Sequence, residues 1–135
     1  EYGGMVDKSG IFNILLFKLK RKERPVIMIT IEDFKKIDIR VGTIIEASIN
    51  KGARKKAYKL KIDFGSLGIK KSSAQITDLY KEEELIGKQI IAVVNFKPIH
   101  ISEITSEVLV LGVVTNKGVV LLNLDKYVEN GTKIS

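Results

Sequence analysis

The most regular alternation of hydrophobic and polar positions lies at residues 58–64. Hydrophobic side chains occupy every even position of this segment, and Lys59, Lys61 and Asp63 occupy the odd positions. Successive side chains of a β-strand point to opposite faces, so this period of two predicts a strand with one buried face and two outward lysines. The side chains predicted to face inward are Tyr58, Leu60, Ile62 and Phe64.

Other segments are also typical of strands. They are predicted at 40–49, 70–76, 89–96, 107–114 and 119–122. The first is rich in β-branched residues, whereas 89–96 and 107–114 are continuous apolar runs, which are typical of strands buried on both faces. The turn sequence at 116–118, Asn-Lys-Gly, predicts a hairpin between the last two strands.

Two short helices complete the prediction. One begins after Thr30 as N-cap and ends near Lys36, and the other covers 78–86 with Gly87 as its C-cap. Five or six short strands, with a helix between the third and fourth, predict an all-β protein: an OB-fold, a five-stranded barrel with short flanking helices. Strands 2 and 3 of such a barrel commonly form the oligonucleotide-binding face, which is where the strand at 58–64 would lie.

Residues 1–30 differ from the rest and are predicted to be an N-terminal extension of a domain at 31–135. Residues 1–4, ahead of Met5, resemble a vector-derived remnant, so that part of the extension would be foreign to the protein. The apolar run 11–17 is followed by basic residues, which is the reverse of the order in a secretory signal. We interpret it as a segment that packs on the domain or on a partner subunit, with weak membrane-surface binding as the alternative.

Composition narrows the function classes. The 135-residue chain has no cysteine and one histidine, His100, which excludes disulfides, thiolate metal sites and histidine-based metal clusters. The sequence contains no run of eighteen apolar residues, so no membrane-spanning helix is predicted. Neither a nucleophilic triad around His100 nor a glycine-rich phosphate loop is found. We therefore predict a cytoplasmic binding domain with no catalytic residue and no cofactor.

The positive charge of the chain is concentrated in one segment. The net charge is +7, and residues 51–71 alone contain eight basic residues and one acidic residue. The rest of the chain is therefore neutral overall. Although scattered lysines commonly form a solvated surface, confinement to one segment predicts an electrostatic contact with nucleic acid.

Six short motifs carry a family resemblance. They are the segments 38–44, 57–65, 72–77, 87–88, 95–98 and 106–112. In this order and spacing they resemble the tRNA-binding domain found at the C-terminus of some methionyl-tRNA synthetases, and within that family the free-standing CsaA type, described as an export-related chaperone. The resemblance covers about residues 31–135.

The resemblance implies an OB-fold, a homodimer built through the terminal elements, and tRNA binding that recognises shape more than sequence. CsaA-type proteins are also associated with unfolded or precursor polypeptides. By resemblance the binding residues include Asn95, Lys97, the pair Ser106-Glu107 and, nearby, Ser73.

The chemistry of these positions allows alternatives. Phosphates need cationic donors, which are supplied by Arg54, Lys55, Lys56, Lys59 and Lys61. Phe96 could stack on an RNA base or cap the barrel core. Glu107, with Ser106, could bond a base edge or a 2′-hydroxyl, or Glu107 could accept from a backbone amide. Asn95 could equally be a turn residue.

One segment departs from the family pattern. The family usually has basic residues and a glycine in the loop that here is 99–105, which has neither and contains Ile99, Ile101 and Ile104. An exposed apolar rim suits a peptide-binding groove. Two hypotheses therefore remain: a tRNA-binding module, and a secretion chaperone that binds unfolded or precursor polypeptides and for which RNA binding is secondary.

Overall fold

The structure, a computed structural model, describes residues 26–101 and 104–135. The chain divides into two compact units, residues 1–31 and 32–135. The apolar run predicted at 11–17 lies outside the described residues.

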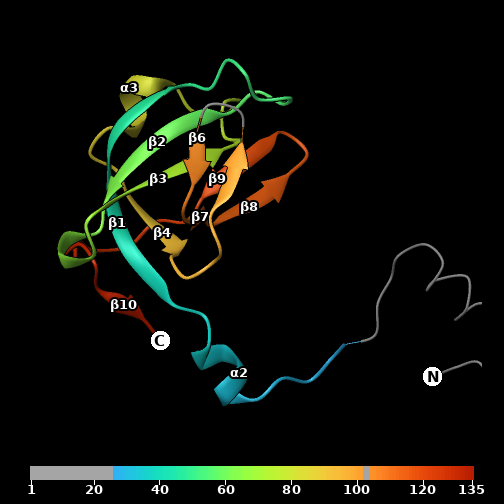
Figure 1. The fold of residues 1–135 in the computed structure, drawn as a ribbon, viewed down its shortest axis with the longest axis vertical. Coiled ribbons are helices and arrows are strands. Elements are labelled where there is room, and N and C mark those ends of the chain that lie inside the picture. Colours follow the sequence, from blue (N-terminus) through green and yellow to red (C-terminus); the bar gives the residue numbers. More distant parts are fainter. Residues whose placement is uncertain (1–25, 102–103) are drawn as a thin grey trace, which may run out of the picture. The chain divides into compact units, whose positions relative to one another are not determined.

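The described residues form short helices and strands in the order drawn in Figure 1. The helical elements are α2 (Ile31–Lys35), the 3₁₀ turn η1 (Gly65–Leu67) and α3 (Glu82–Leu85). The strands are β1 (Ile39–Ile49), β2 (Tyr58–Asp63), β3 (Ile69–Ala74), β4 (Gln89–Val93), β5 (Ile99–Ile101), β6 (Ile104–Ser106), β7 (Leu109–Val110), β8 (Gly112–Thr115), β9 (Gly118–Leu121) and β10 (Lys133–Ile134).

Five antiparallel strands curl into a nearly closed barrel, in the order β3-β2-β1-β4-β7. β10 pairs with the start of β1, and two hairpins, β5–β6 and β8–β9, are attached to this barrel. The prediction of an all-β OB-fold with short flanking helices is confirmed. β1 is the longest strand because it must bend from pairing with β4 to pairing with β2.

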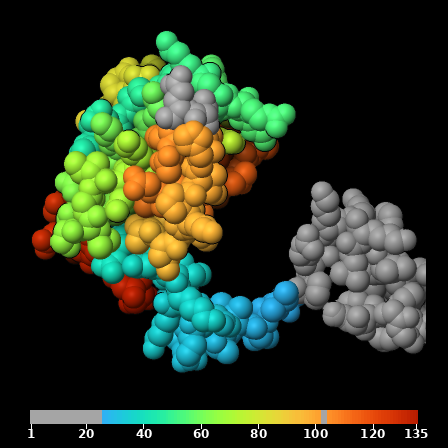
Figure 2. Space-filling model, viewed as in Figure 1, coloured from blue at the N-terminus to red at the C-terminus, as the bar shows by residue number. Residues whose placement is uncertain are grey.

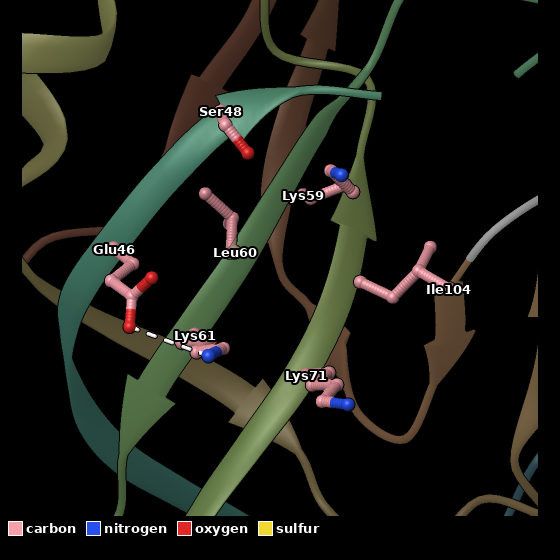
Figure 3. Close-up of a pocket in the computed structure, with 7 residues that line it drawn as sticks. All are labelled: Glu46, Ser48, Lys59, Leu60, Lys61, Lys71 and Ile104. Carbon is pink, nitrogen blue, oxygen red and sulfur yellow. Dashed lines mark ion pairs between the residues drawn. The ribbon is translucent and has the colours of Figure 1, made fainter. Parts of the chain in front are cut away.

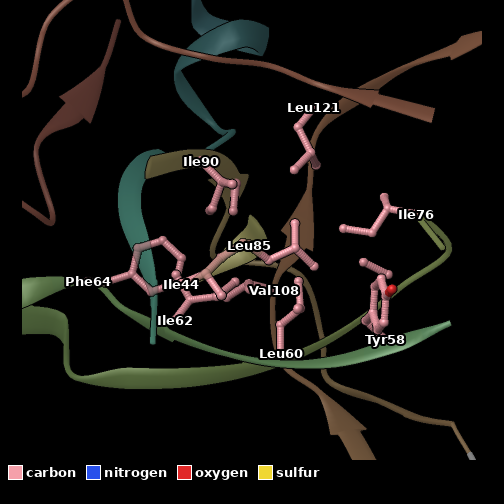
Figure 4. Close-up of a cluster of buried hydrophobic side chains, with 12 residues drawn as sticks. Ile44, Tyr58, Leu60, Ile62, Phe64, Ile76, Leu85, Ile90, Val108 and Leu121 are labelled. Atoms are coloured by element: carbon pink, nitrogen blue, oxygen red, sulfur yellow. The ribbon is translucent and has the colours of Figure 1, made fainter. Parts of the chain in front are cut away.

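The core lies inside the barrel, and the inward side chains of β2 fill its middle (Figure 4). Leu60, Ile62 and Phe64 are fully buried, as the alternation at 58–64 predicts. Tyr58 closes one end: its hydroxyl donates to the carbonyl of Tyr80 at 2.6 Å. Burial, reinforced by the negative charges of the neighbouring α3 glutamates, raises the pKa of Tyr58, so the hydroxyl keeps the proton that this hydrogen bond requires.

A β-bulge in β1 reverses the direction of the side chains that follow it. Ile44 pairs with Ile62 and is fully buried, but the next pair in register is Glu46 with Lys61, so Ile45 is an extra residue. Strict alternation from Ile44 would point Glu46 into the core. Instead Ala47 packs against the core and Glu46 faces out, because a bulge re-aims the side chains beyond it.

The C-terminal segment crosses the barrel backbone at very short range. The amide of Gly131 donates to the carbonyl of Val41 at 2.7 Å, and the amide of Val41 donates to the carbonyl of Thr132 at 3.0 Å. Gly131 has φ +90°, and a Cβ atom there would overlap the carbonyl oxygen of Phe64. Only glycine combines this conformation with this contact.

Three predicted elements were wrong in extent. The strand at 107–114 is broken at Leu111, and β8 is exposed rather than buried on both faces, with Val114 84% exposed. The helix at 78–86 is the single turn α3, and the strand from Gln89 ends at Val93. An apolar run shows that a segment is hydrophobic but not whether other parts of the chain cover it. An apolar strand of an exposed hairpin therefore has the same sequence pattern as a buried strand.

Candidate nucleic-acid interface

The outer face of β1, β2 and β3 carries two rows of polar side chains. Strand register places Lys61 between Glu46 and Lys71 in one row. Two residues along the strands, Lys59 lies between Ser48 and Ser73 in the other. All six side chains face away from the barrel core, as the alternation about Lys59 and Lys61 predicts.

Five of these six side chains, all except Ser73, border an open hollow of about 300 Å³, which Ile104 bounds on the side of β6 (Figure 3). Inside it, Lys61 Nζ lies 3.4 Å from Glu46 Oε2, and both side chains remain partly solvated, at 46% and 64% exposed. Three ammonium groups around a hollow of this size suit a phosphate, which is recognised through cationic donors.

The basic loop between β1 and β2 extends this surface. Arg54, Lys55 and Lys56 are all exposed. Arg54 and Lys55 border a cleft of about 480 Å³ with Ser73 and His100, and Lys55 and Lys56 border a second cleft of about 380 Å³ beside the β8–β9 turn. The five predicted cations therefore lie on β2 and the loop leading into it. Lys71, which the predicted set of site residues omitted, joins them from β3.

A separate groove is mainly apolar. It measures about 550 Å³ and lies between the segment 96–101 and the residues around Leu109, and its polar lining consists of Ser73, Lys97, Ser106 and Glu107. Phe96 is 54% exposed and lies outside the core cluster, so it does not cap the barrel core. The segment predicted as a loop at 99–105 contains β5 and most of β6, which pair as a hairpin and are drawn in orange in Figure 2.

Ser106 and Glu107 close the gap between the two ends of the barrel sheet. Glu107 Oε1 accepts from the Lys71 amide at 3.0 Å, while the Glu107 amide donates to the Lys71 carbonyl at 2.8 Å. Ser106 Oγ accepts from the Ser73 amide at 3.2 Å. β3 and β7 are not paired by a strand ladder, so these bonds stand in for one. Of the two interpretations of Glu107, the structure contains the bond to a backbone amide.

Asn95 and Lys97 have different surroundings. The Asn95 side chain accepts from the Asp38 amide at 2.9 Å and donates to the Lys36 carbonyl at 2.7 Å, so it ties the end of β4 to the start of β1. It lines none of the cavities described here, whereas Lys97 borders the apolar groove. Both were predicted as binding residues, but Asn95 joins β4 to β1 and Lys97 borders the apolar groove.

The neighbouring pair Asp38 and Arg40 has a structural contact. Arg40 Nε donates to Asp38 at 2.7 Å, and Arg40 Nη1 donates to the Gly131 carbonyl at 3.0 Å. The hydrogen bond to Asp38 raises the pKa of Arg40. This fixed charge secures the C-terminal crossing rather than the basic face.

The part of the chain that the structure describes has neither a metal-binding cluster nor a membrane-spanning helix. No group of three or more histidine, cysteine, aspartate or glutamate side chains there could hold a metal ion. Within the same residues, no helix is long and apolar enough to cross a membrane.

Comparison with known families identifies the class of protein to which this barrel belongs. Residues 39–133 match the family described as "Putative tRNA binding domain", and the chain belongs to that family. The methionine–tRNA ligase of Caldanaerobacter subterraneus subsp. tengcongensis is 40% identical over 114 residues, which are 84% of this chain and 18% of that ligase. The chain thus spans less than a fifth of the length of this relative.

Solved structures narrow the class to the CsaA type of tRNA-binding domain protein. The CsaA chaperone protein of Picrophilus torridus is 60% identical, with a TM-score of 0.76 over 80% of this chain and all of that one. The chaperone CsaA of Bacillus anthracis is 53% identical, again with a TM-score of 0.76, over 81% of this chain and all of that one. A methionyl-tRNA synthetase-related protein of Pyrococcus horikoshii is 30% identical, with a TM-score of 0.73 over 82% of this chain and all of that protein.

Proposed function

We propose that this protein binds tRNA in the cytoplasm through the basic face defined by Lys59, Lys61, Lys71 and the loop 51–56. The single observation that carries this proposal is the arrangement of these cations around the outer hollow of β1–β3. Lysines on a sheet contact phosphates rather than base edges, so the face would recognise the shape of the folded RNA more than its sequence.

The test is a titration with unfractionated tRNA at several salt concentrations. A face that neutralises about four phosphates loses roughly 100-fold in affinity between about 50 and about 200 mM salt, because bound counterions are released from the RNA. We expect that steep dependence. An affinity that is unchanged over this range would contradict the proposal.

A second candidate function is binding of unfolded or precursor polypeptides, with export-related chaperone activity, in the apolar groove. It is favoured by the exposure of the groove lining: Phe96 is 54%, Ile99 62% and Leu109 50% exposed. Exposed apolar surface of this kind is typical of a site that binds another chain. Similarity to the CsaA chaperones of Bacillus anthracis and Picrophilus torridus adds support.

For this second function we expect the protein to suppress aggregation of a chemically unfolded client, and the double substitution Phe96→Ser, Leu109→Ser to abolish the effect. Light scattering of the client measures it, with tRNA added as competitor. If the doubly substituted protein still suppressed aggregation, the groove would not be the polypeptide-binding site. Competition by tRNA would indicate one shared surface, and lack of competition two separate surfaces.

We further propose that the protein is a homodimer. Val113 and Val120 form a cross-strand pair on one face of the β8–β9 hairpin and are 51% and 41% exposed, while Val114 on the other face is 84% exposed. The hairpin therefore leaves apolar surface that a second copy could cover. Sedimentation equilibrium at micromolar concentration is expected to give twice the chain mass of 15.1 kDa. A mass of one chain would contradict the proposal.

A further inference from the structure

The carboxylate of Glu46 stands inside the basic face, where it would repel an RNA phosphate. Its side chain borders the same hollow as Lys59, Lys61 and Lys71, and its Oε2 lies 3.4 Å from Lys61 Nζ. Among the described residues it is the only acidic side chain that lines this hollow. The row Glu46-Lys61-Lys71 therefore has a formal charge of +1, and would have +2 without the carboxylate.

The position of Glu46 depends on the bulge in β1. Ile44 is buried, and alternation alone would place Glu46 on the same, inward face. The extra residue Ile45 turns Glu46 outward and sets it directly opposite Lys61 in the register. Bulges that re-aim one side chain in this way are frequent next to functional sites.

The neighbouring charges give this placement an energetic reason. Lys61 and Lys71 are directly opposite each other on β2 and β3, and like charges at such a pair destabilise a sheet. Glu46 flanks Lys61 from the other side and offsets that repulsion in the free protein. When a phosphate enters the hollow it can take over this role, and the carboxylate then becomes a competitor for the same ammonium group.

We infer that Glu46 is an affinity-setting residue: it holds Lys61 in an internal ion pair, so that an RNA phosphate must displace the carboxylate before it can use Lys61. This inference rests on the proposed tRNA-binding function. It follows that Lys61 adds little to tRNA affinity while Glu46 is present, and that removing the charge of Glu46 releases one further phosphate contact. The chemistry recognised is a phosphodiester of the RNA backbone.

The experiment is a double-mutant cycle measured by tRNA titration over several salt concentrations. The substitution Glu46→Gln is expected to tighten binding about three- to fivefold at low salt, the range set by an exposed ion pair, and to steepen the salt dependence by about one unit of slope. In the Lys61→Ala background, Glu46→Gln is expected to change affinity less than about twofold, because the partner it releases is gone.

A matched control is Glu32→Gln, which changes the net charge equally but lies on α2, before the start of β1 (Figure 1). It is expected to leave the affinity unchanged, and thermal unfolding verifies that every variant is folded. Equal tightening by Glu46→Gln with and without Lys61 would overturn the inference, since Glu46 would then act only by general repulsion. No tightening at all would also overturn it. Failure of the wild-type protein to bind tRNA would instead contradict the proposed function itself.

Discussion

Replacing Lys55, Lys56, Lys59 and Lys61 together by alanine is expected to lower tRNA affinity about 100-fold at moderate salt. Each lysine that contacts a phosphate adds about one unit to the slope of log affinity against log salt. Because Glu46 already pairs with Lys61, the slope should fall by about three units rather than four. The titration that tests the proposed function measures both quantities.

A control variant separates the site from the net charge. Lys35, Lys36, Lys126 and Lys133 are four exposed lysines outside the segment 51–71, and replacing them by alanine removes the same charge. This variant is expected to keep most of the affinity and nearly all of the slope. Equal losses in the two variants would mean that the RNA responds to total charge and that the outer face of β1–β3 is not the site.

The substitution Gly131→Ala is expected to destabilise the fold by about 3 kcal/mol. Part of this, about 1 kcal/mol, arises because an L-residue at φ +90° is strained. The larger part arises because the added methyl group would overlap the Phe64 carbonyl, so the C-terminal segment must move and its bonds with Val41 must weaken. Chemical denaturation followed by circular dichroism measures the free energy of unfolding.

Gly87→Ala is the matched control for that substitution. Gly87 has a similar φ of +86°, but no atom lies within 4 Å of a Cβ built there. It is expected to cost about 1 kcal/mol, the conformational part alone. If the two variants were equally stable, the close crossing of the C-terminal segment over Phe64 would contribute nothing to the fold.

The elements that could be predicted from sequence are those with one buried face. At residues 58–64 the inward side chains alternate with charged ones, so the pattern records both the strand and its orientation. The prediction of one strand at 107–114, buried on both faces, was wrong because its hydrophobic residues lie in two environments: Val108 is buried, while Val114 is 84% exposed. A continuous apolar run contains no signal that separates the two.

The candidate site was only partly predictable for a different reason. The charge count located the basic residues, but pairing across strands is set by register, and the bulge at Ile45 changes the register within one strand. No local pattern therefore indicated that Glu46 faces Lys61, or that Lys71 completes the row. Likewise, the bond from Glu107 to the Lys71 amide joins residues far apart in the chain and depends on barrel closure.

Closure of the barrel by side chains has a consequence for how the molecule moves. Elsewhere the barrel strands are joined by backbone ladders, but β3 meets the 106–108 segment through Ser72, Ser106 and Glu107 together with a single backbone bond, from the Glu107 amide to the Lys71 carbonyl. A seam with so little backbone pairing opens at lower free energy than the ladders around it. The strand that borders the opening is β3, which carries Lys71 and Ser73. The edge of the basic face thus borders the seam at which the fewest backbone bonds hold the barrel closed.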